Sequence, residues 1–494
     1  MLSRRAFLLN SAALAAAPNL SLAAEPEPTI LKLQRRAIEV NGKAASVYAI
    51  GRSDGVGGVV ADRGSRFRVR VENELADSSL LHWHGLTPPS AQDGVPGLSG
   101  PAIPPGGSAE YDFPLPFGGT YFMHAHYGFQ EQLLLAAPLI VRDPKRYADW
   151  QEVVVMLADF SFRSPQEIYA ALTGGRAPGH ATGMGHDMGG MAMDHAAMDH
   201  AAMGHAATRH SDMGEMAGMP TPMAKPDLND VDYDAFLANE RTLADPQVVQ
   251  IENGGRVLLR VINSAAMSAF HVDLGENAAK LVAVDGQDVA PVAGSRFPIA
   301  VGQRLDLLVE TPKGGGAIAV FFVLEGEARR TGLILAPPRA HISRLPDKAE
   351  AASAALDLSL EEQLRAAAPL AARKADRVVP IDLTGDMASY VWSINNVVWD
   401  EKTPPIALKS GERVELAMTN RTMMSHPMHL HGHRFQVVDI DGRRFDGALR
   451  DTVLVPPGKR VVVAFDADNP GHWAFHCHLL YHAQAGMFAS FKYS

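Results

Sequence analysis

Three stretches of the chain share one alternating pattern of apolar and polar residues. Residues 64–73, 254–263 and 411–420 each begin with glycine, have arginine third, place apolar residues fourth, sixth and eighth, and end with asparagine. Alternation with a period of two predicts a half-buried β-strand after a glycine turn. Because one spacing recurs in three copies, the pattern indicates an internal repeat and hence three related β-domains.

Histidine pairs follow the first and third copies of this repeat at matching distances. An HxH motif at 82–84 begins nine residues after the first copy, and another at 429–431 begins nine residues after the third. The second copy has valine at that distance. Two more HxH motifs, at 124–126 and 476–478, each begin five residues after a glycine. We therefore expect the outer domains to share a histidine site and the middle domain to be a spacer that sets their geometry.

Two segments do not follow the strand pattern. Residues 174–226 are rich in Met, His, Gly and Ala and contain few large apolar residues around which to fold. Residues 347–375 are rich in Ala and Glu and predict a helical connection between the second and third domains.

Composition limits the class of protein. A chain of 494 residues and 53.0 kDa suits two to four domains, and a hydrophobic content of 47% is ample for buried cores. The net charge of -10 argues against a nucleic-acid partner. Cys477 is the only cysteine, which excludes an intramolecular disulfide.

The N-terminus has the pattern of an export signal. Paired arginines at Arg4 and Arg5 precede an Ala- and Leu-rich stretch that ends in small residues near Ala24. Residues 1–24 therefore predict a signal peptide of the twin-arginine type. A membrane anchor is the weaker alternative, because an apolar run of roughly 14 residues is too short to span a bilayer. We expect a periplasmic protein without stable membrane insertion.

The four HxH motifs predict a metal cluster. Residues i and i+2 of a strand face the same side, so each motif presents two imidazoles to one space. Imidazoles without carboxylates favour a late first-row metal such as copper over Mg, Ca or Mn. Eight ligands suit three ions, two of them held by three nitrogens each and one held by two. The eight histidines are His82, His84, His124, His126, His429, His431, His476 and His478.

A second kind of site surrounds the cysteine. Cys477 lies between two of these histidines, and the third domain adds His426, His482 and Met487, giving a His2Cys set with an axial methionine. Such a set is typical of an electron-transfer copper. Because Cys477 adjoins His476 and His478 in the chain, an electron accepted at the thiolate copper has a short covalent route to the cluster.

These motifs resemble those of the multicopper oxidases, the laccase-like family, over nearly the whole chain after residue 24. The resemblance implies an all-β fold of three cupredoxin-like Greek-key β-sandwich domains. We predict these at 25–145, 146–345 and 376–494, with the Met/His-rich insert 174–226 in the second and a linker at 346–375.

The resemblance also implies four copper ions and their ligands. The type 1 copper is expected at His426, Cys477, His482 and Met487; the type 2 copper at His82 and His429; and the type 3 pair at His84, His124, His126, His431, His476 and His478. The family oxidises a reductant by single electrons at type 1 copper and reduces dioxygen to water at the cluster.

Asp93 and Cys477 are the predicted catalytic residues. Asp93 matches a family acid near the cluster, with the expected role of orienting a ligand or bound water and relaying protons; an aspartate of a turn before Gly94 is the alternative. Many relatives place a glutamate just after the histidine equivalent to His482. Here Ala483 and Gln484 cannot titrate, so we expect a stronger dependence on Asp93.

The insert suggests the reductant. Its segment 180–223 holds ten of the 20 methionines and six of the 20 histidines, with a Met-x-His unit repeated every five residues. A five-residue step forms no continuous apolar stripe on a helix. Thioethers are soft ligands suited to Cu(I), and the segment resembles the Met-rich segments of copper-resistance multicopper oxidases. Candidate labile Cu(I) ligands are His195, Met198, His200, Met203 and His205.

We therefore favour a monomeric cuprous oxidase whose substrates are dioxygen and Cu(I). The thioether of Met487 predicts a type 1 potential below that given by Leu or Phe, and hence an easily oxidised reductant. Phenols, in a laccase-like enzyme, or Fe(II), in a ferroxidase, are alternative reductants. The competing interpretation of the insert is a disordered linker that binds copper incidentally. The competing interpretation of the whole chain is a copper-sequestering periplasmic protein that is not an enzyme.

Overall fold

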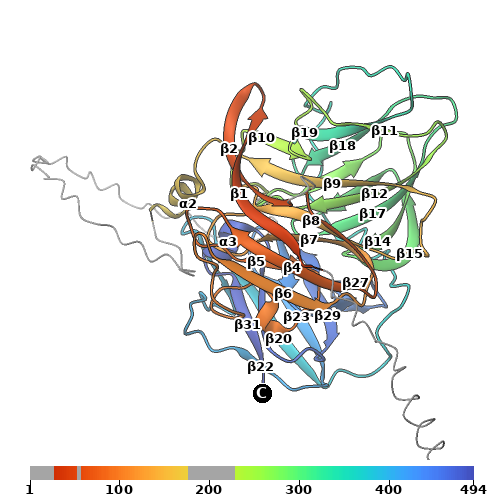
Figure 1. The fold of residues 1–494 in the computed structure, drawn as a ribbon. Coiled ribbons are helices and arrows are strands. Elements are labelled where there is room, and N and C mark those ends of the chain that lie inside the picture. The colour runs from red at the N-terminus through yellow and green to blue at the C-terminus, as the bar shows by residue number, and fades with distance from the viewer. Residues whose placement is uncertain (1–26, 53–56, 176–227) are drawn as a thin grey trace, which may run out of the picture.

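The computed structural model describes residues 27–52, 57–175 and 228–494 (Figure 1). The predicted signal peptide at 1–24 and the candidate labile copper ligands of the insert lie outside these residues. In the described part of the chain, no helix combines the length and apolar character needed to cross a membrane.

The first β-sandwich consists of two four-stranded sheets, in the orders β2-β1-β4-β6 and β3-β8-β7-β5. Side chains from both sheets, among them Leu33, Phe67 and Trp83, form one buried core. The strands are β1 (Thr29–Val40), β2 (Lys43–Arg52), β3 (Val59–Asp62), β4 (Arg66–Asn73), β5 (Leu81–His84), β6 (Ser108–Pro114), β7 (Gly119–Ala125) and β8 (Ala136–Arg142). The short 3-10 helix η1 (Ser90–Gln92) directly precedes Asp93.

The second sandwich has sheets in the orders β10-β9-β12-β17-β14-β15 and β11-β19-β18-β13-β16. Its strands are β9 (Gln151–Phe160), β10 (Ala235–Ala238), β11 (Val248–Gln250), β12 (Arg256–Asn263), β13 (Phe270–Asp273), β14 (Ala279–Val284), β15 (Gln287–Gly294), β16 (Arg296–Ile299), β17 (Arg304–Glu310), β18 (Ile318–Leu324) and β19 (Arg330–Ala336). Helix α2 (Pro165–Thr173) follows β9; Ser164 and Glu167 cap its first turn reciprocally, and Gly174 ends it with φ 62°.

The third sandwich has sheets in the orders β21-β20-β23-β29-β25-β26, with β27 paired to β25, and β22-β31-β30-β24-β28. Its strands are β20 (Arg377–Asp386), β21 (Val391–Ile394), β22 (Ile406–Leu408), β23 (Arg413–Asn420), β24 (His426–Leu430), β25 (Phe435–Ile440), β26 (Arg443–Arg444), β27 (Leu449–Arg450), β28 (Thr452–Val455), β29 (Arg460–Asp466), β30 (His472–Cys477) and β31 (Phe488–Tyr493). Helix α3 (Leu480–Gln484) joins β30 to β31.

The three sandwiches share one strand topology. In each, the repeated strand pairs in parallel with the first long strand of its domain: β4 with β1, β12 with β9, and β23 with β20. An edge strand likewise pairs in parallel with the last strand: β3 with β8, β11 with β19, and β22 with β31. The all-β fold and the threefold internal repeat predicted from the sequence are thus confirmed.

The asparagine that ends each repeated strand has the same role in all three domains. The side-chain amide of Asn73 donates to the carbonyls of Asp77 and Ile103, and its oxygen accepts from the amide of Leu75. Asn263 and Asn420 make the equivalent three bonds in their own domains. Each asparagine therefore fixes the loop that follows its strand. In the two outer domains, this loop leads to the strand that carries the first HxH motif.

The helix predicted at 347–375 is wrong, because this segment contains turns and extended backbone but no helix. Leu356, Leu358 and Leu360 are buried, the first in irregular backbone and the last in a short turn closed by the bond from the amide of Leu364 to the carbonyl of Leu360. Its backbone also bonds to neighbouring strands, as when the amide of Ala290 donates to the carbonyl of Arg365. The composition of the segment favoured a helix, but burial between domains two and three decided its structure.

Candidate metal centre

The strands that carry the HxH motifs pair within each outer sandwich. His82 on β5 lies directly opposite His124 on β7, and His429 on β24 lies opposite His476 on β30. The corresponding strands of the middle domain are β13 and β18, where His271 is the one histidine. The predicted matching of the first and third domains is therefore present in the structure, as is the loss of the motifs from the second.

The eight histidines converge at the junction of the first and third sandwiches, and we call them the histidine cluster. Across this junction His82 Nε2 lies 3.4 Å from His429 Nε2, and His84 Nδ1 lies 3.1 Å from His478 Nε2. His126 Nε2 lies 3.3 Å from His476 Nε2. Seven of the eight side chains are buried and His126 is half-buried.

In the histidine cluster, one nitrogen of a ring donates a hydrogen bond outward. The other nitrogen, which carries no hydrogen, faces the equivalent nitrogen of a neighbouring ring. His431 Nδ1 faces Asp93 Oδ2 at 2.8 Å, and His476 Nδ1 faces the carbonyl of Cys477 at 2.9 Å. These oxygens can only accept hydrogen bonds, so both Nδ1 atoms carry the ring hydrogen. Both Nε2 atoms therefore have no hydrogen and present a lone pair. Those two Nε2 atoms are 3.0 Å apart. A cation between or beside them satisfies both, whereas no hydrogen bond can.

The same argument applies to the pair that crosses the domain junction. His82 Nδ1 lies 2.9 Å from the carbonyl of Asp93, and His429 Nδ1 lies 2.8 Å from the carbonyl of Asp451. Their Nε2 atoms therefore also present lone pairs to each other. His124 Nε2 is buried and has no hydrogen-bond partner among the described residues.

Protonation does not resolve these contacts. Burial holds the pKa values of His84, His431 and His476 well below the usual range of histidine, so the rings stay neutral near pH 7. Neutral imidazoles with free nitrogens are metal ligands. The donor set thus fits late first-row metal ions, and one group whose ligand atoms lie within 4.8 Å of one another is His126, His431 and His476.

A second group, which we call the sulfur site, lies on the other side of β30. Cys477 Sγ is 3.6 Å from His426 Nδ1 and 3.9 Å from His482 Nδ1, and these two nitrogens are 3.2 Å apart. Met487 is fully buried, and its backbone bonds to His482 and Cys477. Burial raises the pKa of the Cys477 thiol, so a thiolate at this position requires a cation.

Carboxylates lie beside the outer nitrogens of several rings, and all but Glu131 form a hydrogen bond there. Asp93 contacts His431 and, through its carbonyl, His82, so this predicted residue lies in the cluster. Sequence reasoning missed three others. Asp451 Oδ1 lies 3.0 Å from His84 Nε2, Glu131 Oε2 lies 3.3 Å from His124 Nδ1, and Asp230 Oδ2 accepts from His482 Nε2 at 2.9 Å. Asp93 is therefore one of several acids beside these histidines.

Residues on both sides of the insert lie near the sulfur site. Tyr169, on the helix that precedes the insert, donates its hydroxyl to the carbonyl of Gln484 at 3.4 Å, two residues after His482. Asp230, which follows the insert, bonds to His482 itself and accepts from Tyr390 at 2.6 Å. Helices α2 and α3, which carry Tyr169 and His482, accordingly lie near each other (Figure 1).

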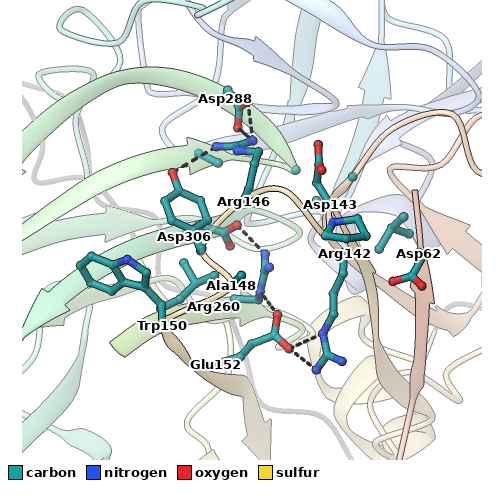
Figure 2. A pocket seen from close by; sticks show the side chains of 18 residues that line it. Asp62, Arg142, Asp143, Arg146, Ala148, Trp150, Glu152, Arg260, Asp288 and Asp306 are labelled. Carbon is teal, nitrogen blue, oxygen red and sulfur yellow. Dashed lines mark hydrogen bonds and ion pairs between the residues drawn. The ribbon is translucent and has the colours of Figure 1, made fainter. Parts of the chain in front are cut away.

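A cavity of about 550 Å³ lies elsewhere, between the first and second sandwiches. Figure 2 shows its charged lining, in which Arg260 pairs with Glu152 and Asp306, and Arg146 pairs with Asp288. None of the predicted metal ligands is among the described residues that line it. Each arginine that lines the cavity is paired with a carboxylate. None of these arginines is therefore free to bind an anionic substrate.

Comparison with known proteins identifies the family. Three models described as multicopper oxidase match residues 32–146, 152–332 and 373–494. The multicopper oxidase MmcO of Mycobacterium tuberculosis is 30% identical over 467 residues, covering 92% of this chain and 85% of that protein. Copper resistance protein A of Escherichia coli is 26% identical, with 86% of each chain covered. The crystal structure of Fet3p, a multicopper oxidase that functions in iron import, superimposes with a TM-score of 0.74 at 18% identity, covering 94% of this chain and 90% of that one.

The chain therefore belongs to the multicopper oxidase family. It is a copper-dependent oxidoreductase with three cupredoxin-like β-sandwiches, and its substrates are a reductant and dioxygen. The exact domain boundaries at 25–145, 146–345 and 376–494 stay predictions.

Glu325 gives a prediction for stability. This buried carboxyl borders a small cavity beside Met267 and Met424. Burial raises its pKa to about 7, against 4.5 for an ordinary glutamate. Between these pH values the folded state holds a proton that the unfolded state has lost, so the stability contributed by the neutral carboxyl falls as pH rises from 4.5 to about 7.

Glu325→Gln should remove this loss, which amounts to about 3 kcal/mol of unfolding free energy. Denaturant unfolding at pH values on either side of the window measures it. Exposed Glu276 supplies the control, because Glu276→Gln should leave the pH profile unchanged. Identical pH profiles for wild type and Glu325→Gln would contradict the prediction.

Proposed function

We propose that this protein is a cuprous oxidase that holds four copper ions and reduces dioxygen to water with electrons from Cu(I). The observation that carries the proposal is that the chain on both sides of the Met/His-rich insert contacts the His482 region: Tyr169 before it bonds to the carbonyl of Gln484, and Asp230 after it bonds to His482. The bound copper ions would supply the one-electron redox chemistry that couples the two half-reactions.

The contacts support a division of ligands among four ions. His426, Cys477, His482 and Met487 would bind type 1 copper, and His82 and His429 would bind type 2 copper. The short nitrogen contacts favour dividing the type 3 ligands into two groups, His126, His431 and His476 in one, and His84, His124 and His478 in the other.

The remaining polar residues orient these ligands. The carbonyls of Asp93 and Asp451 fix the Nδ1 hydrogens of His82 and His429, which leaves both Nε2 atoms free for a metal. Thr422 Oγ1 lies 2.8 Å from His426 Nε2, so that Nδ1 of this ring faces the sulfur. Asp93 Oδ1 is buried without a hydrogen-bond partner among the described residues, and we assign it a role in passing protons to oxygen.

Cu(I) is favoured over other reductants because the sequence of the insert supplies soft ligands, and Asp230, which follows the insert, bonds to His482. Similarity to proteins named for copper resistance supports the same choice. Phenol oxidation and Fe(II) oxidation, the latter suggested by similarity to Fet3p, are the alternative activities. Copper sequestration without catalysis is disfavoured, since every predicted ligand of both sites is present. Export to the periplasm and a monomeric state complete the proposal.

The first prediction concerns the sulfur site. Purified wild type should hold about four copper ions per chain and absorb at about 600 nm, where a Cys-ligated Cu(II) in a His2Cys site absorbs. Cys477→Ser should remove this band and about one copper, while the histidine cluster keeps its metal. Elemental analysis and absorption spectra measure both. Wild-type protein with one copper per chain, or with none, refutes the proposal.

The second prediction concerns the insert. Replacing residues 180–223 by a Gly/Ser linker of equal length keeps Tyr169 and Asp230 and should sharply lower Cu(I) oxidation while sparing a small organic reductant. A matched variant that keeps the six histidines but changes the ten methionines of the segment to leucine tests the thioethers alone. Oxygen uptake with each reductant is the measurement. Equal loss of both activities, or of neither, counts against Cu(I) delivery.

The third prediction concerns Asp93. Asp93→Asn keeps an oxygen that can accept from His431 but cannot carry a proton, so oxygen reduction should fall about 10- to 100-fold with full copper content. Asp112→Asn, at an exposed aspartate of the same sandwich, is the control. Near-normal oxygen reduction by fully metallated Asp93→Asn would show that Asp93 is not the proton-relaying residue.

A further inference from the structure

The middle domain has no HxH motif, but one of its side chains reaches the histidine cluster. Arg304 is the first residue of β17 and is fully buried. Its guanidinium donates to both carboxylate oxygens of Asp451, at 2.7 and 2.5 Å. It also donates to the carbonyl of Thr120 at 3.1 Å and to that of Gly302 at 3.0 Å. Arg304 thus joins all three sandwiches.

Asp451 in turn contacts one histidine from each outer domain. Its Oδ1 accepts from His84 Nε2 at 3.0 Å, and its main-chain carbonyl accepts from His429 Nδ1 at 2.8 Å. These two bonds decide which nitrogen of each ring is left for a metal: Nδ1 of His84 and Nε2 of His429. A shift of Asp451 would therefore disturb both rings together.

The space around this contact is closed. A Cβ at Gly85, directly after His84, would lie 2.3 Å from Arg304 Nη2 and 2.7 Å from Asp451 Oδ2. A Cβ at Gly302 would lie 2.8 Å from the ring of His478. Glycine at both positions lets the middle domain pack directly behind the cluster. A side chain at Gly85 would therefore displace the guanidinium or the carboxylate.

Electrostatics fixes the same arrangement. Both partners of the Arg304–Asp451 ion pair are almost wholly buried. A two-point guanidinium–carboxylate pair is stronger and more directional than a single charged hydrogen bond. Removal of one partner would leave the other charge buried and unpaired.

We propose that Arg304 is a positioning residue through which the middle domain holds His84 and His429 in place for metal binding. This inference rests on the ligand assignment proposed above. It gives the domain that lost its histidines a direct part in the metal site, beyond that of a spacer. Two residues of the interdomain cavity support it, because Arg260 donates to the Thr120 hydroxyl and Asp306 accepts from it, while the carbonyl of Thr120 accepts from Arg304.

Arg413 provides a matched control. This arginine of β23 is also buried and makes a two-point pair with one carboxylate, Asp466, at 2.7 and 2.9 Å. Its guanidinium bonds to neither Asp451 nor a histidine in the hydrogen bonds of the described residues. Arg413→Gln should therefore lower global stability without reorienting the cluster.

The test compares wild type, Arg304→Gln, Arg304→Lys and Arg413→Gln after copper loading. The blue absorption of the sulfur site serves as a gauge of folding, and the electron paramagnetic resonance signal of type 2 copper is the readout. Arg304→Gln should bind type 2 copper about 10- to 100-fold more weakly and change its signal, while the blue band stays. Arg304→Lys keeps the charge but not the two-point geometry, and should fall between Arg304→Gln and wild type.

The outcomes separate this inference from the proposed function. Wild-type protein without blue and type 2 signals would refute the ligand assignment itself. A normal wild type with an unchanged type 2 signal and affinity in Arg304→Gln would overturn the positioning role, as would an equal loss in Arg413→Gln. If Arg304→Gln does not accumulate as folded protein, Arg304→Lys decides: a wild-type signal and affinity overturn the role, and a weakened, altered site supports it.

Discussion

Imidazole lone pairs that face one another inside a buried domain junction are the constraint on which the rest of this structure depends. The outer nitrogen of His82, His429 or His476 bonds to a main-chain carbonyl, so the inner nitrogen has no hydrogen to share. Burial lowers the pKa values of His429 and His476, which keeps these two rings from taking up protons. The arrangement is therefore costly for protein alone, and metal ions are what make it stable.

This cost explains the architecture around the cluster. Two sandwiches must be held together while their facing groups oppose contact, and the structure does this with buried ion pairs. Arg304, Arg450 and their carboxylate partners connect the middle domain, the linker and the third domain at residues that are almost wholly buried. Buried ion pairs stabilise only when they are complete, so this network favours one relative placement of the domains. The middle sandwich therefore helps to hold the residues of the metal site in position.

Local pattern predicted the parts of the site that lie on strands. The repeated strands and the HxH motifs have short periods, and the strands formed at the same positions, so that the eight histidines converged as expected. Asp451 and Asp230 could not be predicted in this way, because His84 and Asp451 are 367 residues apart in the chain. No motif in the sequence around Asp451 indicates a contact that forms only when distant parts of the chain fold together. The segment at 347–375 failed for a related reason: its composition favours a helix, but the buried positions of Leu356, Leu358 and Leu360 depend on the domains around it.

The pleat of two neighbouring strands explains how two kinds of site can lie back to back. On β30, His476 and Cys477 are consecutive, so their side chains leave opposite faces of the sheet. On β24, His429 pairs with His476, and Met428, on the other face, pairs with Cys477. His426, three residues before His429, therefore shares the face of the thiol and meets it at 3.6 Å. One strand thickness separates the two sites, and the peptide that joins His476 to Cys477 crosses it. A helix offers no such alternation, which is why adjacent ligands for two different sites call for a β-strand.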